Sequence, residues 1–247
     1  MTEWIARRDD PRKPFSMPVL LSFVAGYLDT YTYLTLFGLF AAQVTGSFVI
    51  AGAEFVASDF GIAGKLLAIV AFLVAAAATT ACIVLARDAG RAILPWMLGL
   101  EALLLAIFAA IVVFGPAVKN AHDWHGIVAG LFAAMAMGAQ SVLVRLLMQD
   151  IPQTNVMTGN MTQLGIAVTE LVITGRRSAR SGAGAAASEV AKARSRLITV
   201  LAIAIGFLAG AAAGAIAFAT IGLRGTFAAV VIIAGLALWA GAREGTG

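Results

Sequence analysis

The chain has 247 residues, of which 61% are hydrophobic and 12% charged, and its mean hydropathy is +0.93. Soluble domains average roughly 45–50% apolar and ~25% charged residues, so this composition excludes an ordinary soluble protein and indicates an integral membrane protein. The net charge of +4 comes from basic residues in a few loops and near the ends, without interleaved aromatics. Membrane topology explains this charge better than nucleic-acid binding does.

Six apolar runs are long enough for helices that cross about 30 Å of hydrocarbon at ~1.5 Å per residue. Transmembrane strands would instead alternate in polarity over about ten residues, a pattern that the sequence lacks. The expected fold is therefore an all-α integral membrane protein with six long transmembrane helices. The runs cover roughly residues 17–38, 62–86, 92–114, 125–148, 197–221 and 223–242.

These runs predict two membrane regions of similar organisation. The N-terminal tail is mixed in charge and precedes an apolar run without a convincing cleavage site, so we expect an uncleaved first span. Residues 175–196 are rich in Gly, Ala, Ser and basic side chains, and we expect them to form a mobile cytoplasmic loop. The predicted regions are the tail 1–16, a first membrane repeat 17–114, a connecting loop 115–124, a second membrane repeat 125–242 and a C-terminal tail 243–247.

Two shorter segments, 40–57 and 156–174, carry a repeated polar element within apolar sequence. The first contains QVTGSFVIAG and the second VMTGNMTQLG. Aligning their Thr-Gly pairs superposes two halves, each with one long span, the polar element and two further spans. If the segments are re-entrant half-helices, the chain has six spans and inverted halves, as in many secondary transporters; if they cross fully, it has eight spans and parallel halves. We favour six spans.

Basic residues orient the chain, because short loops rich in Lys and Arg stay cytoplasmic. The N-terminal tail and residues 175–196 carry the main basic clusters, so both are expected inside, together with the C-terminus. With six spans the loop that holds Arg87 and Arg91 is also inside; with eight spans it moves outside.

The two polar elements and their flanks resemble the signature regions of the YoaK-like bacterial membrane proteins, a family defined by a domain of unknown function. The regions read AGYLDTYTYLTLFGLFAAQVTGSFVIAGAEF and GAQSVLVRLLMQDIPQTNVMTGNMTQLG, and the resemblance spans about residues 17–240. The first element usually reads Thr-Gly-Asn in that family, whereas here Ser47 replaces the asparagine. The resemblance implies a polytopic inner-membrane protein, also singles out Asp29, and supplies no substrate.

Polar side chains within the apolar runs are candidates for a solute site. Asp29 and Glu101 lie near the middle of predicted spans, where burying an ionisable group costs on the order of 2.5–3.5 kcal/mol on insertion scales. Such an acid marks a proton, ion or substrate pathway, or else a hydrogen-bonded group that ties helices together. The three tyrosines cluster around Asp29, where packing is an equal alternative. The candidate solute-binding residues are Asp29, Tyr31, Thr45, Gly46, Ser47, Glu101, Gln140, Thr158, Gly159 and Asn160.

Small residues recur at every fourth position in two of the spans. Such stripes let helix backbones approach closely, so they predict two tight helix contacts, either within the chain or across a homodimer. The stripes are Gly126, Gly130, Ala134 and Gly138 in one span, and Ala202, Gly206, Gly210 and Gly214 in another.

The sequence lacks the phosphate-loop, zinc-protease and nucleophile-elbow motifs, so no enzyme, cofactor or metal site is predicted. We expect a small-solute transporter or permease whose partners are the lipid bilayer and an unknown small solute, and not nucleic acid. The alternative is a non-transporting membrane scaffold or assembly protein in which the same elements only pack helices.

Overall fold

Helices form almost all of the structure, a computed structural model that describes residues 16–57, 61–148, 151–181 and 184–244. No strand occurs in these ranges, so the expected all-α fold is confirmed for the described residues. The helices in chain order are α2 (Ser16–Thr35), α3 (Val44–Ala57), α4 (Ile62–Asp88), α5 (Leu94–Phe114), α6 (Trp124–Leu147), α7 (Met157–Ser181), α8 (Gly184–Ile221), the 3-10 turn η2 (Gly222–Gly225) and α9 (Thr226–Glu244).

Four stretches of the described chain are long and apolar enough to cross a membrane. They are α4, α5, α6 and the stretch Ser188–Arg243, in which η2 joins α8 to α9. α2 falls outside this group because Asp29 and several hydroxyl-bearing residues lower its hydropathy, and α3 contributes a shorter apolar helix, Val44–Ala53. The chain is thus a multi-pass membrane-type protein. Length and composition do not decide whether α2 crosses the membrane, or whether α8 and α9 cross it separately.

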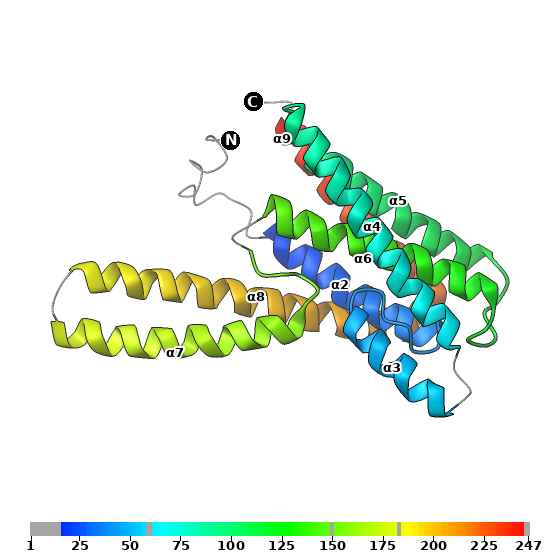
Figure 1. Ribbon diagram of the computed structural model, residues 1–247, viewed down its shortest axis with the longest axis horizontal. Coiled ribbons are helices and arrows are strands. Elements are labelled where there is room, and N and C mark those ends of the chain that lie inside the picture. Colours follow the sequence, from blue (N-terminus) through cyan, green and yellow to red (C-terminus); the bar gives the residue numbers. More distant parts are fainter. Residues whose placement is uncertain (1–15, 58–60, 149–150, 182–183, 245–247) are drawn as a thin grey trace.

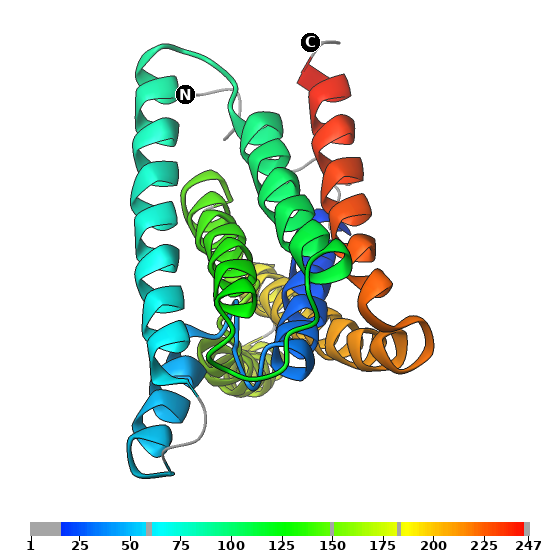
Figure 2. The same ribbon diagram turned by 90° about the vertical axis from the view of Figure 1, so that its right-hand side faces the viewer.

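α4, α5, α6 and α9 pack side by side as a bundle, in which α6 contacts both α4 and α5, and α9 contacts α5 (Figures 1 and 2). α2 packs along α8 and touches α6 and α9. The centre is apolar and fully buried, with Leu28 from α2, Leu98 and Phe108 from α5, Met137 from α6 and Ile233 from α9. In a bilayer such a core is stabilised by close packing, since lipid is as apolar as the side chains.

The α2–α8 contact is made by one of the two predicted small-residue stripes. A Cβ placed on Gly210 would overlap the backbone of Phe23, and one on Gly214 would lie 2.7 Å from the carbonyl oxygen of Tyr27. From the other side, a Cβ on Gly26 would overlap the backbone of α8. The glycines therefore let the two backbones touch, within the chain.

The second stripe, on α6, is used in two ways. Gly138 faces the backbone of α4, where an added Cβ would lie 2.5 Å from the carbonyl oxygen of Phe72. Gly126 and Gly130 instead accommodate side chains of the neighbouring loops, chiefly Val118 and Leu39. The predicted tight helix contact is made at Gly138, and the rest of the stripe receives loops.

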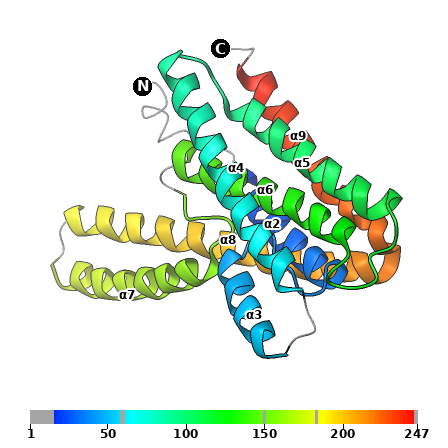
Figure 3. The same cartoon turned by 45° about the vertical axis from the view of Figure 1, so that its right-hand side comes forward.

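α7 and the N-terminal half of α8 form a helical hairpin that projects from the bundle (Figures 1 and 3). The prediction of a mobile loop over 175–196 is therefore wrong, because α7 continues to Ser181 and α8 begins at Gly184. The segment is rich in Ala and Arg, which are good helix formers. Arg196 and Glu170 pair across the hairpin at 3.6 Å, an exposed contact of small energetic value.

Candidate functional site

Asp29 is buried in α2, and its carboxylate holds the loop that precedes α3. The side chain is 3% exposed, and Oδ1 accepts the backbone N–H of Ala42 at 2.6 Å. The amides of Ala41 and Gln43 also face the carboxyl group. Oδ2 has no hydrogen-bond partner among the described residues. Asp29 therefore fixes the end of the loop 36–43 through the backbone amides that face its carboxyl group.

Each predicted Thr-Gly element lies in the first turn of a helix, at the start of α3 or of α7. The residue after each Thr-Gly pair then makes a hydrogen bond to a carbonyl seven positions earlier. Ser47 Oγ donates to Phe40 O at 3.1 Å, and Asn160 Nδ2 donates to Gln153 O at 2.6 Å. Both loops are thus folded onto the helix start in the same way.

In each Thr-Gly element the residue that follows the glycine faces the interior, whereas the threonine does not. Ser47 and Asn160 are each 1% exposed, whereas Thr45 and Thr158 are exposed. Gly159 is exposed as well, and Gly46 packs against a ring. The ribbon views agree that α3 and α7 begin near one another at the centre of the structure and run apart (Figures 1 and 3).

Gln140 is fully buried in α6 and holds the corresponding loop before α7. Its Nε2 donates to Thr154 Oγ1 at 2.8 Å and to Leu21 O at 3.1 Å. The next residue, Ser141, accepts a hydrogen bond from Asn155 Nδ2. A polar side chain of the preceding helix therefore holds the loop in front of each Thr-Gly helix.

Ser22 of α2 extends this arrangement to α8. Its hydroxyl lies 2.9 Å from Thr154 O and 2.8 Å from Ile203 O, so one side chain joins α2, the loop before α7 and α8. The predicted site did not include Ser22, Thr154 or Asn155. The polar run QTN at 153–155, directly before the second Thr-Gly element, is the sequence feature that indicates two of them.

The tyrosines of α2 hold the connection between α8 and α9. Tyr31 donates from its hydroxyl to Gly222 O at 2.6 Å, and Tyr27 donates to Gly225 O at 2.7 Å. The third tyrosine, Tyr33, is exposed. The hydroxyls of Tyr27 and Tyr31 are therefore directed at η2 and donate there instead of to the Asp29 carboxyl group.

Glu101 lies fully buried on α5, a helix that packs against α6 and α9. Neither carboxyl oxygen has a hydrogen-bond partner within the described part of the chain. Glu101 therefore does not tie α5 to its neighbours through a carboxyl hydrogen bond within the described residues, although a buried polar group without a partner costs free energy.

The sequence matches the family model described as protein of unknown function (DUF1275) over residues 17–240. The chain belongs to the DUF1275 family. The match runs from α2 to the C-terminal part of α9 and confirms the resemblance noted from the two signature regions. No curated protein and no solved structure matches the chain.

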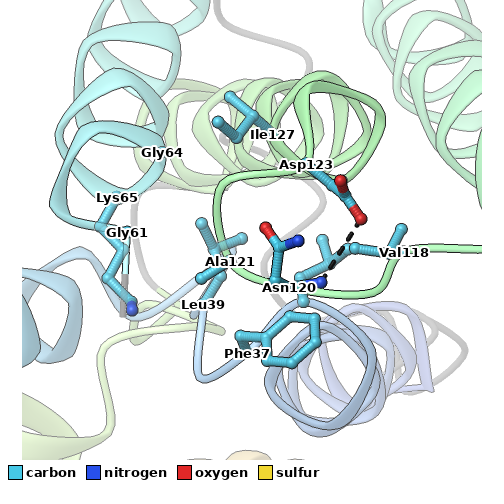
Figure 4. A pocket seen from close by; sticks show the side chains of 12 residues that line it. Phe37, Leu39, Gly61, Gly64, Lys65, Val118, Asn120, Ala121, Asp123 and Ile127 are labelled. Atoms are coloured by element: carbon cyan, nitrogen blue, oxygen red, sulfur yellow. Dashed lines mark hydrogen bonds between the residues drawn. The ribbon is translucent and has the colours of Figure 1, made fainter. Parts of the chain in front are cut away.

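Two openings on this DUF1275 protein lie away from the predicted residues. The first, beside the start of α4, has room for about one water molecule, at roughly 20 Å³ (Figure 4). Figure 4 shows the Lys65 amine directed away from Asn120 and Asp123. The second is a groove of about 400 Å³ between α2 and α9, with a mainly apolar lining. The predicted solute-binding residues line neither opening.

Proposed function

We propose that this DUF1275 protein is a small-solute transporter or permease of the inner membrane, with six spans, two half-helices and two inverted halves. The observation that carries the proposal is the matched start of α3 and α7, closed by the Ser47–Phe40 and Asn160–Gln153 hydrogen bonds. Helices that begin at membrane depth, where two inverted repeats meet, are the parts with which many secondary transporters bind solutes.

The helix packing is consistent with two related halves, as the proposal requires. If α2 to α5 correspond to α6 to α9, the α2–α8 pair corresponds to α6–α4, and α3–α4 corresponds to α7–α8. The α2–α8, α4–α6 and α7–α8 pairs are among the main contacts of the structure, and so is α5–α9, which such a symmetry would map onto itself. Two contacts are looser than their counterparts: α3–α4 compared with α7–α8, and α2–α9, where the apolar groove lies, compared with α6–α5.

Basic residues at one end of the bundle support cytoplasmic termini. The ends of α4 and α6 are adjacent, because the Arg87 guanidinium donates to Leu146 O at 3.4 Å. Figure 2 places the C-terminal ends of α4 and α9 at the same end as the start of α5, which follows Arg91. Since short loops rich in Lys and Arg stay inside, this end is cytoplasmic in the proposed topology.

Asp29 is the proposed proton or cation site of the transporter. It combines an unpartnered buried oxygen with direct control of the loop before α3. Ser47 and Asn160 set the position of the two helix starts, and Gln140 holds the second loop. A solute that binds between the helix starts would change both loops together.

Flux measurements on the purified protein test this proposal. The protein is reconstituted into liposomes that contain a pH dye, and amino acids, sugars, carboxylates and nucleosides are supplied one at a time. We expect at least one solute to move, and Asp29→Asn and Asn160→Ala to lower its flux at least about tenfold, equivalent to roughly 1.4 kcal/mol. Thr169→Ala, at an exposed position on α7, is the matched control.

Equal flux in wild type and in both variants, for every solute that moves, would remove these residues from the mechanism. A folded protein that moves none of the solutes favours the second candidate, a membrane scaffold or assembly protein. In that case Asp29→Asn and Asn160→Ala lower stability or oligomerisation and give a deletion strain no solute-dependent phenotype.

A further inference from the structure

A buried polar cluster connects α2, α6 and the loop before α7. We call it the Gln140 cluster, and it consists of Ser22, Gln140, Ser141, Thr154 and Asn155. Four of these side chains are at most 2% exposed, and Ser141 is partly buried. Hydrogen bonds join these residues to one another or to shared carbonyls, so the cluster forms one polar centre inside an apolar bundle.

The orientation of both amides in the cluster is fixed by their neighbours. Gln140 Nε2 faces Leu21 O, and a carbonyl can only accept, so the nitrogen must be on that side. Ser141 donates its one hydroxyl hydrogen to Met137 O at 2.9 Å, so it must accept from Asn155 Nδ2. The carbonyl oxygens of both amides are left without a hydrogen-bond partner among the described residues.

Ser22 brings one hydroxyl that two carbonyl oxygens share. Its hydroxyl has one hydrogen, yet it lies within 2.9 Å of two carbonyl oxygens, those of Thr154 and Ile203. One of these contacts therefore lacks a proton at any moment. The Gln140 cluster therefore holds two buried amide oxygens that have no hydrogen-bond partner among the described residues, and an unpaired buried acceptor costs free energy until a donor or a cation satisfies it.

We propose that the Gln140 cluster binds a desolvated monovalent cation. Neutral carbonyl and amide oxygens replace the hydration shell of alkali ions at membrane depth, and unwound backbone beside half-helices supplies such sites in transporters. The cluster contains no carboxylate, which Ca²⁺ and Mg²⁺ sites use, so a single positive charge fits better than two. The cation would lie where α2, α6 and the loop before α7 meet, and its binding would hold that loop in place.

A role of this cation in driving transport rests on the proposed transport function, whereas the binding of the cation to the cluster does not. The test is therefore thermal unfolding of the detergent-solubilised protein in NaCl, KCl or choline chloride at constant ionic strength. We expect NaCl or KCl to raise the unfolding midpoint over choline chloride in a saturable way. At tenfold above the dissociation constant the rise should be roughly 3–5 °C.

Two substitutions of Gln140 test whether the salt-specific rise of the unfolding midpoint comes from the Gln140 cluster. Gln140→Met keeps the side-chain length and removes the unpaired oxygen, so the salt-specific shift should disappear. Gln140→Glu keeps the shape and adds negative charge, so the apparent affinity for the cation should rise at least about tenfold and CaCl₂ should become stabilising. Thr169→Ala, which lies outside the cluster, should retain the wild-type shift.

Equal midpoints of the wild type in all three salts would overturn the cation site, and so would a shift that Gln140→Met and Gln140→Glu leave unchanged. Solute flux in liposomes with only choline as the monovalent cation, without any thermal shift, would overturn the cation site and leave the transporter standing. A thermal shift in a protein that moves no solute supports the cation site and counts against the transporter.

Discussion

The side-chain amide of Asn160 donates to the carbonyl oxygen of Gln153 at 2.6 Å, which folds the loop before α7 onto the start of that helix. Ser47 makes the corresponding bond to Phe40 O at 3.1 Å. Ser47 therefore makes the same kind of bond as Asn160, with a shorter side chain. The two loops are thus held by the same kind of hydrogen bond from different side chains, and exchanging these side chains tests the role of the bond.

Asn160→Ala should lower the free energy of unfolding by about 1–2 kcal/mol, because the carbonyl of Gln153 loses its donor in a partly buried position. Ser47→Asn should be close to neutral, since the amide can make the same bond. Both are measured by equilibrium unfolding of the purified protein in mixed micelles. A neutral Asn160→Ala would show that the loop is held by other contacts.

Gly210→Ala should destabilise the protein by about 1–3 kcal/mol, because the new Cβ overlaps the backbone of Phe23 and a backbone cannot rotate away. Gly165→Ala on α7 is the matched control, since nothing lies within 4 Å of its Cβ position. There the helix propensity of alanine should give a gain of up to about 1 kcal/mol. Thermal unfolding midpoints of the two variants, moving in opposite directions, would confirm the α2–α8 contact.

Tyr31→Phe should cost about 1 kcal/mol, because the carbonyl of Gly222 loses its hydrogen-bond donor while the ring remains in place. Tyr33→Phe, at an exposed position, should change stability by less than about 0.5 kcal/mol. Limited proteolysis at the connection between α8 and α9, alongside unfolding, distinguishes the two. Equal behaviour of both variants would argue that Tyr31 does not hold η2.

Asp29→Asn should fold, because the amide oxygen can still accept the N–H of Ala42, whereas Asp29→Ala should lose roughly 1.5–3 kcal/mol, the range for hydrogen bonds to charged groups. The comparison separates support of the loop from a transport role. If flux falls in Asp29→Asn while stability is kept, the carboxyl acts in transport; if both variants lose stability equally, its charge serves the loop.

Cysteine labelling tests the proposed topology in a Cys82→Ser background. Gly90→Cys lies between α4 and α5, and Asn120→Cys lies between α5 and α6, at exposed positions. With six spans and cytoplasmic termini, an impermeant thiol reagent added outside the cell should label Asn120→Cys and spare Gly90→Cys. The reverse pattern would support eight spans and parallel halves.

The local features of the chain could be predicted because they depend on nearby residues. Apolar runs, the Thr-Gly elements and the close-packing glycines follow from hydropathy and spacing, so the all-α membrane fold, the positions of α4, α5 and α6 and the family were predicted correctly. The prediction of a loop over 175–196 is wrong because the alanines and arginines of this segment favour helix more strongly than its Gly and Ser residues oppose it.

The partners of the buried polar groups were decided by tertiary structure. Asp29 meets Ala42, Gln140 meets Thr154, and Ser22 reaches a carbonyl 181 residues away on α8. Composition and periodicity determined that these side chains would be buried in a membrane protein. Which atoms they satisfy, and which oxygens they leave unpaired, depends on how α2, α6 and α8 pack, and sequence spacing carries no record of contacts between such distant helices.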